Sequence, residues 1–246
     1  MTRAIILTTQ RTGSTFLEDC LTTHPEIFCE GEILMAGMTI RVPHLIHDSR
    51  QLAKLYRFIV GGAWNPTHLM TRFFSSGDKP VRIFKAMYNH LAVPCTLRYL
   101  QRDEAIRVLH LRRHNVLKQY VSKLLLSKPR VKAWQPHATK PVPVVRTHVD
   151  PEKALENMRK TRAQYEHFER IFASHPRLAL VYESMIADGA LSTDVQQRIC
   201  AFLGVSYHAM HSPLIKINPD RLQEMVINYE ELARAVKHSE FADLLD

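Results

Sequence analysis

One stretch near the N-terminus constrains the fold more than any other, and it reads AIILTTQRTGSTFLEDCL. Its leading apolar residues predict a short buried strand over Arg3–Thr9. Its second half predicts a helix over Ser14–Thr23, which ends before His24-Pro25 because proline disfavours a helical residue ahead of it. A tight turn that contains Gly13 joins the two. The stretch therefore predicts a strand–turn–helix unit of an α/β fold.

Strands and helices alternate along much of the remaining chain. Further strands are predicted at Val81–Met87, Arg107–Leu111 and Arg177–Tyr182, and helices from about Asn115, from Asp150-Pro151, over Val195–Leu203, over Pro219–Val236 and around 52–59. Four prolines make residues 128–149 a loop or lid. The alternation predicts an α/β, P-loop-like three-layer fold with a central, mainly parallel sheet flanked by helices. At 246 residues, the chain fits a single domain over 1–246.

The first strand–helix junction has the features of an anion-binding site. Backbone N–H groups and the helix dipole favour negative charge at a helix start. Arg11 adds a forked cation that suits phosphate, and Ser14 and Thr15 add hydroxyl donors. The junction is not a Walker A motif, because Thr8 stands where its first glycine should be and no lysine follows Gly13. The alternative is that the Ser-Thr pair only caps the helix.

A second junction, HLRRHNVLKQYVS at 110–122, repeats this pattern. Arg112 and Arg113 end a strand, Asn115 is a candidate N-cap, and Lys118 and Ser122 share one helix face. Open α/β sheets bind ligands at the carboxyl ends of their strands, so both junctions should face the same side. The alternative is a solvated basic helix start.

Charge and cysteine content narrow the possible partners. The formal net charge of +9 indicates partners of opposite sign, and nucleic acid, an anionic membrane, phosphate-bearing cofactors and acidic acceptors all qualify. The four cysteines form no CxxC pair, so neither zinc nor any other metal is expected. No apolar run approaches the ~20 residues of a membrane span. The N-terminus does not have the pattern of a signal peptide, and we expect a cytoplasmic protein.

With two anion sites on one edge, the sequence resembles the sulfotransferases that use 3′-phosphoadenosine-5′-phosphosulfate (PAPS) and release adenosine 3′,5′-bisphosphate (PAP). RTGST is similar to the family's 5′-phosphosulfate loop, which assigns donor binding to Arg11, Thr12, Gly13, Ser14 and Thr15. RRHN…S is similar to its 3′-phosphate motif, with Ser122 and either Arg112 or Arg113 as ligands. HPEIFCEGE resembles tyrosylprotein sulfotransferases, and the tail SPLIKINPDRLQEMVINYEEL resembles bacterial carbohydrate sulfotransferases.

The resemblance also implies which residues carry catalysis. Cytosolic members use a histidine two residues after a strand lysine, but Met87 stands at that distance from Lys85. The tyrosylprotein type instead uses a glutamate 21 residues beyond the loop arginine, which corresponds to Glu32, with Glu30 in reserve. Lys85 and Arg11 would neutralise the leaving group. Each of these residues could instead be an ordinary surface charge.

Later segments offer supporting residues. Lys216 and Asn218 are expected to close over the donor, although Asn218-Pro219 could equally cap a helix. Tyr182 and Glu183 could brace the site, but core packing is the expected role for the pair.

The acceptor and the reaction class remain open at this stage. The basic stretch 128–150 is expected to be a flexible lid or an acceptor-binding loop, because it holds five Lys or Arg and, before Asp150, no acid. The acceptor hydroxyl would belong to an acidic tyrosine peptide or a saccharide. Two alternatives to a metal-free sulfotransferase are a P-loop kinase acting on a small metabolite and a basic nucleic-acid-binding module. No reader motif supports the latter, so no nucleic-acid partner is expected.

Overall fold

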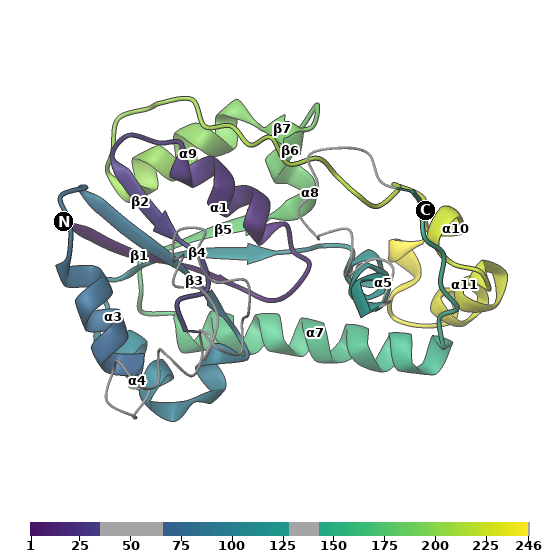
Figure 1. The fold of residues 1–246 in the computed structure, drawn as a ribbon. Helices are drawn as coiled ribbons and strands as arrows, with labels where there is room; N and C mark the ends of the chain where they lie inside the picture. Colours follow the sequence, from purple (N-terminus) through teal and green to yellow (C-terminus); the bar gives the residue numbers. More distant parts are fainter. Residues whose placement is uncertain (35–65, 128–142, 246) are drawn as a thin grey trace, which may run out of the picture.

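A central parallel sheet organises the molecule, as a computed structural model that describes residues 1–34, 66–127 and 143–245 shows (Figure 1). The five strands lie in the order β2-β3-β1-β4-β5, and all neighbouring pairs are parallel. They are β1 (Thr2–Thr8), β2 (Ile27–Glu30), β3 (Val81–Met87), β4 (Arg107–Arg112) and β5 (Arg177–Val181). The predicted α/β class with a central parallel sheet is confirmed.

Helices cover both faces of this sheet, which gives three layers (Figure 1). Side chains along β1 alternate between two cores: Ala4 and Ile6 face one, Ile5 and Leu7 the other. The first core contains α1 (Ser14–Thr22) and α9 (Thr193–Leu203). The second contains α3 (Pro66–Ser75), α4 (Pro94–Arg102), α5 (Val116–Ser127) and α7 (Pro151–Ile171). A strand buried on both faces must be apolar throughout, which explains the AIIL run.

The predicted long helix forms as α7, and its start is capped as expected. The Asp150 carboxylate accepts hydrogen bonds from the backbone N–H groups of Glu152 and Lys153. Pro151 occupies the first turn, where its missing N–H costs nothing. Met158 within the helix and Phe172, the residue directly after it, are fully buried. The helix thus packs in the core that also contains residues of β1, β3 and β4.

The C-terminal helix predicted over Pro219–Val236 is wrong. Two shorter helices form instead, α10 (Leu222–Met225) and α11 (Tyr229–Lys237). The chain is extended at Val226, which forms a parallel bridge with Thr147, and the Ile227 N–H donates to the Thr147 carbonyl oxygen. This tertiary pairing competes with local helix propensity and interrupts the helix. Residue 218 therefore lies ahead of α10 and outside any helix.

Several short elements were not predicted. They are β2, the helices α3 and α4, the one-turn helix α8 (Tyr182–Met185), the 3₁₀ helices η1 (His90–Ala92) and η2 (Ala242–Leu244), and the hairpin of β6 (Ile186–Ala187) and β7 (Ala190–Leu191). The helix expected around 52–59 and most of the loop expected over 128–149 lie outside the described residues.

Candidate active site

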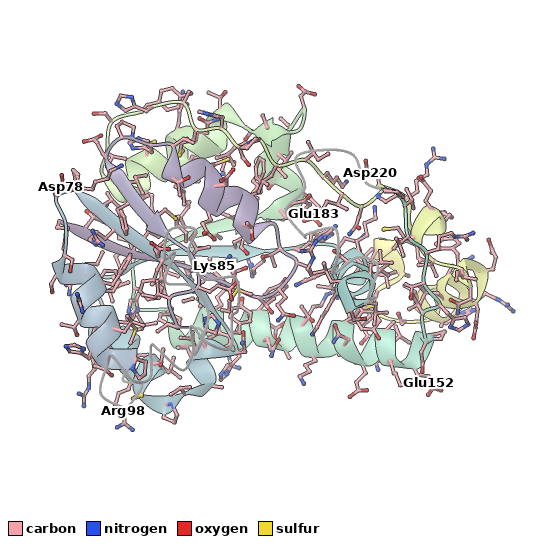
Figure 2. All side chains as sticks on the ribbon, in the orientation of Figure 1. Asp78, Lys85, Arg98, Glu152, Glu183 and Asp220 are labelled. Carbon is pink, nitrogen blue, oxygen red and sulfur yellow. The ribbon has the colours of Figure 1, made fainter. Side chains whose placement is uncertain are left out.

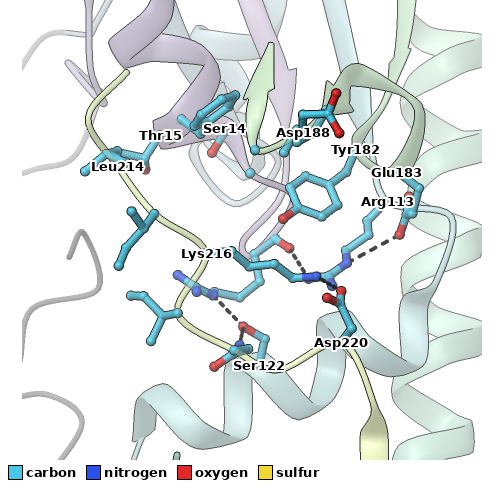
Figure 3. Close-up of a pocket in the computed structure, with 18 residues that line it drawn as sticks. Ser14, Thr15, Arg113, Ser122, Tyr182, Glu183, Asp188, Leu214, Lys216 and Asp220 are labelled. Carbon is cyan, nitrogen blue, oxygen red and sulfur yellow. Dashed lines mark hydrogen bonds and ion pairs between the residues drawn. The ribbon is translucent and has the colours of Figure 1, made fainter. Parts of the chain in front are cut away.

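A cavity of about 510 Å³ opens where the first and second junctions meet (Figure 3). Four segments surround it: the loop after β1 with the start of α1, the chain from the end of β4 to the middle of α5, the chain from Tyr182 through the β6–β7 hairpin, and the segment 214–220. Its size falls within the ~300–1,000 Å³ typical of small-molecule sites. The lining residues are Arg11, Gly13, Ser14, Thr15, Phe16, Arg113, Ser122, Tyr182, Glu183, Ile186, Asp188, Gly189, Leu214, Ile215, Lys216, Ile217, Asn218 and Asp220.

The loop after β1 depends on an unusual backbone shape. Gly13 has a φ of 82°, and a Cβ at this position would overlap the ring of Tyr182. Arg11 also adopts a left-handed φ of 65°, which is uncommon outside glycine. Gly13 is the N-cap of α1 and has no side chain with which to cap it. Ser14 and Thr15 are the first two residues of the helix and line the cavity, so the alternative that they only cap it is wrong.

Thr12 has a structural role within the same loop. It is fully buried, and its hydroxyl lies 2.6 Å from the Thr8 hydroxyl and donates to the Thr9 carbonyl oxygen. The Thr8 hydroxyl in turn bonds the Leu111 carbonyl oxygen of β4. The Thr12 side chain therefore fixes the loop to the end of β1, and it does not line the cavity.

The structure separates the two arginines at the end of β4. The Arg112 guanidinium pairs with Glu169 of α7 at 3.0 Å and lies outside the cavity lining. Arg113 lines the cavity, and its Nη1 donates to the Arg11 carbonyl oxygen at 3.2 Å. Its guanidinium also lies 4.8 Å from the centre of the Tyr182 ring. Of the two, Arg113 is the one placed to meet a ligand.

Ser122 joins the two predicted anion sites. Its side-chain oxygen accepts a hydrogen bond from Arg11 Nε at 2.9 Å and one from Asn218 Nδ2 at 2.8 Å, and the residue is buried (Figure 3). Because the oxygen accepts twice, its own O–H is available to donate. The expectation that both junctions face the same side is confirmed. Asn218 does not cap a helix, since the next helix begins at Leu222.

Two of the cavity's cations, Arg11 and Arg113, lie close enough to affect each other. Burial, and then the nearby charge of Arg113, lower the pKa of Arg11. Two guanidinium groups held this close repel each other, and an anion between them would relieve the repulsion. Lys216 also lines the cavity and pairs with Asp220 (Figure 3). The lining also holds the acids Glu183, Asp188 and Asp220, so the preference for an anion is local to Arg11 and Arg113.

Tyr182 and Glu183 both contribute to the cavity, and Tyr182 also packs against the core. The Glu183 carboxylate accepts from the backbone N–H groups of His114 and Asn115 at 2.8 and 3.1 Å, so it occupies the positive end of α5. It also lies 3.5 Å from Arg113 Nε. The expectation of core packing is confirmed for Tyr182, which packs against the core that contains α1 and α9 and also lines the cavity. It is wrong for Glu183, which binds the start of α5.

A second cluster of charges lies beside Thr15, at the end of α1 that carries Gly13. Its centre is Lys85 of β3, whose side chain is buried and lies in the middle of the molecule (Figure 2). Lys85 Nζ lies 2.9 Å from Glu18 Oε2, 3.3 Å from Glu32 Oε1 and 3.5 Å from Thr15 Oγ1. We call Glu18, Lys85 and Glu32 the Lys85 cluster. It brings the predicted pair Lys85 and Glu32 together within reach of the first junction.

Glu18 was not predicted, although the sequence contains a signal for it. It lies four residues after Ser14 and three after Thr15, which places the three side chains on one face of α1. Glu30, the reserve residue, is the last residue of β2, and its charge acts on Arg82. The two acids that contact Lys85 therefore come from different parts of the chain. Glu18 lies within α1, and Glu32 lies just after β2.

The described residues bear on two possibilities, a metal site and a membrane-spanning helix. Among residues 1–34, 66–127 and 143–245, no three His, Cys, Asp or Glu side chains come together as a metal site. Within the same ranges, no helix combines the length and apolar character needed to cross a bilayer.

Comparison with known proteins identifies the fold. No family model and no curated protein matches this sequence. Among solved structures, a sulfotransferase from Alicyclobacillus acidocaldarius is similar with a TM-score of 0.54 and 16% identity, over 100% of this chain and 97% of that one. The sulfotransferase domain of the Synechococcus PCC 7002 olefin synthase has a TM-score of 0.49 and 16% identity, over 100% of this chain and 81% of that one. The similarity to the Alicyclobacillus acidocaldarius structure shows that this chain has the fold of a sulfotransferase.

Proposed function

We propose that this protein is a sulfotransferase that moves a sulfuryl group from PAPS to an acceptor hydroxyl. The observation that carries the proposal is the meeting of Arg11, Arg113 and Ser122 in one cavity. They come from two strand–helix junctions, and a ligand with phosphates at two places would engage both. ATP, in contrast, carries its phosphates in one chain and does not need a second anion site.

Each end of the donor has a set of residues that suits it. The 5′-phosphosulfate would lie on Arg11, Gly13, Ser14 and Thr15 at the start of α1, where helix N–H groups favour an anion. The 3′-phosphate would lie between Arg113 and the Ser122 hydroxyl. Lys216 and Asn218 come from the segment 214–220 and would cover the donor from the solvent side.

The Lys85 cluster supplies the chemistry for the transfer. Glu32 would take the proton from the acceptor hydroxyl as its oxygen forms a bond to sulfur. The bond from sulfur to the bridging phosphate oxygen breaks, and Lys85 and Arg11 would neutralise the charge that remains on PAP. Glu18 is the competing base. We favour Glu32 because its side chain is 26% exposed, against 17% for Glu18, and Glu18 lies closer to Lys85.

The acceptor is a hydroxyl of an acidic peptide tyrosine or of a saccharide. The basic composition of residues 128–150 supports an acidic or polymeric acceptor in both cases. The two classes differ in the acidity of the hydroxyl, and both would need a base such as Glu32.

The test uses purified protein with labelled PAPS, a panel of tyrosine peptides and oligosaccharides, and PAP in a calorimeter. We expect label in one acceptor class, without added metal, and PAP binding that stabilises the protein by about 2.7 kcal/mol at a concentration of 100 times Kd. Arg11→Ala should abolish turnover. Glu32→Gln should lower kcat far more than donor affinity, whereas Glu30→Gln serves as the matched control.

Other outcomes would assign the protein elsewhere. Magnesium-dependent consumption of ATP without transfer of label would indicate a kinase. Salt-sensitive DNA binding with no response to PAP would indicate a nucleic-acid-binding module. If Glu32→Gln keeps full activity and Glu18→Gln loses it, the base is Glu18.

A further inference from the structure

A buried histidine lies beside the Lys85 cluster and has no role in the mechanism above. His90 begins η1, immediately beyond the end of β3 that carries Lys85. Its side chain is only 4% exposed, and its Nε2 lies 3.6 Å from Glu32 Oε2. Within the part of the chain that the structure describes, this Nε2 has no hydrogen-bond partner. A buried, unpaired ring nitrogen that points at the proposed base needs a physical account.

The other ring nitrogen settles where the proton is. His90 Nδ1 accepts a hydrogen bond from the backbone N–H of Met87 at 3.2 Å. A nitrogen that accepts must have a free lone pair, so a neutral ring carries its proton on Nε2. Burial is the main cause that lowers the pKa of His90, and the charge of Lys85 adds to it, while Glu32 opposes them. The ring is therefore neutral near pH 7 and presents an N–H to Glu32.

This tautomer excludes His90 as the base. The Nε2 that faces Glu32 has no free lone pair, and Nδ1 is already occupied by the Met87 N–H. His90 can donate toward the site but cannot accept a proton there without losing its contact to the end of β3. The 3.6 Å distance from His90 Nε2 to Glu32 Oε2 exceeds the length of a hydrogen bond by about half an ångström. A small movement of the Glu32 side chain would bring the two atoms into a hydrogen bond.

We propose that His90 is a positioning residue, whose Nε2–H holds one oxygen of Glu32 while Lys85 holds the other. The proposal rests on the proposed function and deepens it. Glu32 Oε1 faces Lys85 Nζ and Oε2 faces His90 Nε2, so the two contacts would fix the plane of the carboxylate. Each oxygen keeps a further lone pair for the acceptor proton. A fixed base raises the rate of proton transfer without touching the donor.

The charged and titratable groups around Glu32 come from several elements. Lys85 belongs to β3, His90 to η1, and Glu18, which binds the same Lys85, to α1. Cys29 of β2 is influenced by both Glu18 and Lys85, and burial raises the pKa of its thiol so that it stays neutral. Among these, His90 is the group that offers an uncharged N–H donor to the carboxylate.

A pair of substitutions separates positioning from a purely structural role. In His90→Asn the short amide can still accept from the Met87 N–H, but it no longer reaches Glu32. In His90→Gln the amide N–H₂ lies near the position of the lost Nε2. We expect kcat to fall about tenfold in His90→Asn and to recover largely in His90→Gln, with the acceptor that takes up label in the panel above. His175→Asn replaces another buried histidine and is the control for general destabilisation.

PAP affinity should stay within about twofold in both His90 variants, because His90 does not line the donor cavity and the loss of one remote contact leaves donor binding intact. Nitrogen NMR of the unaltered protein adds a readout that needs no activity. The His90 ring should be protonated at Nε2, and its resonance should move in Glu32→Ala but not in Glu30→Ala.

The outcomes distinguish the two levels of the proposal. If the unaltered protein neither binds PAP nor transfers label, the proposed function is wrong and the role of His90 falls with it. If both occur but His90→Asn keeps the kcat of the unaltered protein, or both His90 variants lose it equally, His90 does not position the base. The proposal is also overturned if NMR shows the His90 proton on Nδ1, or if the His90 resonance does not move in Glu32→Ala.

Discussion

Replacing Ser122 with alanine tests the junction between the two anion sites most directly. In the unaltered protein the Ser122 oxygen accepts from Arg11 Nε and Asn218 Nδ2, and its O–H is available for a phosphate. A hydrogen bond to a charged group contributes about 1.5–3 kcal/mol. Since about 1.4 kcal/mol corresponds to a tenfold change, Ser122→Ala should weaken PAP binding about 10- to 100-fold.

Stability should change much less than affinity. Without the serine oxygen, Arg11 and Asn218 lose one acceptor each, but both line the cavity, where water can replace it. We expect a loss of about 1 kcal/mol in the free energy of unfolding, or about 2–4 °C in Tm for a chain of this size. Calorimetric titration with PAP and a thermal melt measure the two quantities.

Ser127→Ala is the matched control on the same helix. Ser127 is the last residue of α5, and its hydroxyl is exposed and donates to the Leu124 carbonyl oxygen. PAP affinity should not change in this variant. An affinity in Ser122→Ala equal to that of the unaltered protein would refute the reasoning, because the two junctions would then not share a ligand through this residue.

Three further predictions concern the loop, the arginine pair and a buried histidine. Gly13→Ala should abolish PAP binding and lower Tm, because the added Cβ meets the Tyr182 ring at a left-handed φ; retained binding in a titration would contradict this. Arg113→Ala should weaken PAP binding about 100-fold, whereas Arg112→Ala should leave it unchanged, and equal losses would contradict the assignment. Burial lowers the pKa of His110 to about 3, so the unfolded state takes up its proton first and stability falls as pH drops below the ordinary value near 6.5. Between pH 7 and pH 5 this group should cost about 2 kcal/mol in the free energy of unfolding, and urea titrations of His110→Phe should show a correspondingly smaller loss.

Sequence patterns predicted the elements that are locally self-sufficient. The β1–α1 unit, β3, β4 and α7 all have a clear apolar period or an N-cap such as Asp150. The elements that were missed are held by tertiary contacts. The strand β2 is four residues long and exists through its pairing with β3. The break between α10 and α11 follows from the bridge to Thr147, which no local pattern contains.

The same distinction between local and tertiary determinants applies to the residues of the candidate site. Arg11 followed from the physics of helix starts, because such positions attract anions in any α/β sheet. Ser122 lies in the middle of α5, and its expected role came from the resemblance of RRHN…S to a 3′-phosphate motif. The choice between Arg112 and Arg113 was not accessible, since it depends on which side of the strand end meets Glu169 of α7. His90 was missed because its partner Glu32 comes from another element and is brought to it only by the fold. Glu18 could have been proposed from its place on the same face of α1 as Ser14 and Thr15, but its contact with Lys85 could not.

The dipeptide Tyr182-Glu183 has a consequence for finding further chains of this kind. The tyrosine ring occupies the space that a side chain at position 13 would need, and the glutamate takes up the N–H groups at the start of α5. Two distant loops of the cavity thus depend on two adjacent residues that follow β5. A database query built on the glycine loop alone would collect many unrelated nucleotide binders, whereas one that also demands an aromatic–acid pair after the fifth strand should retrieve proteins in which both loops are supported in this way.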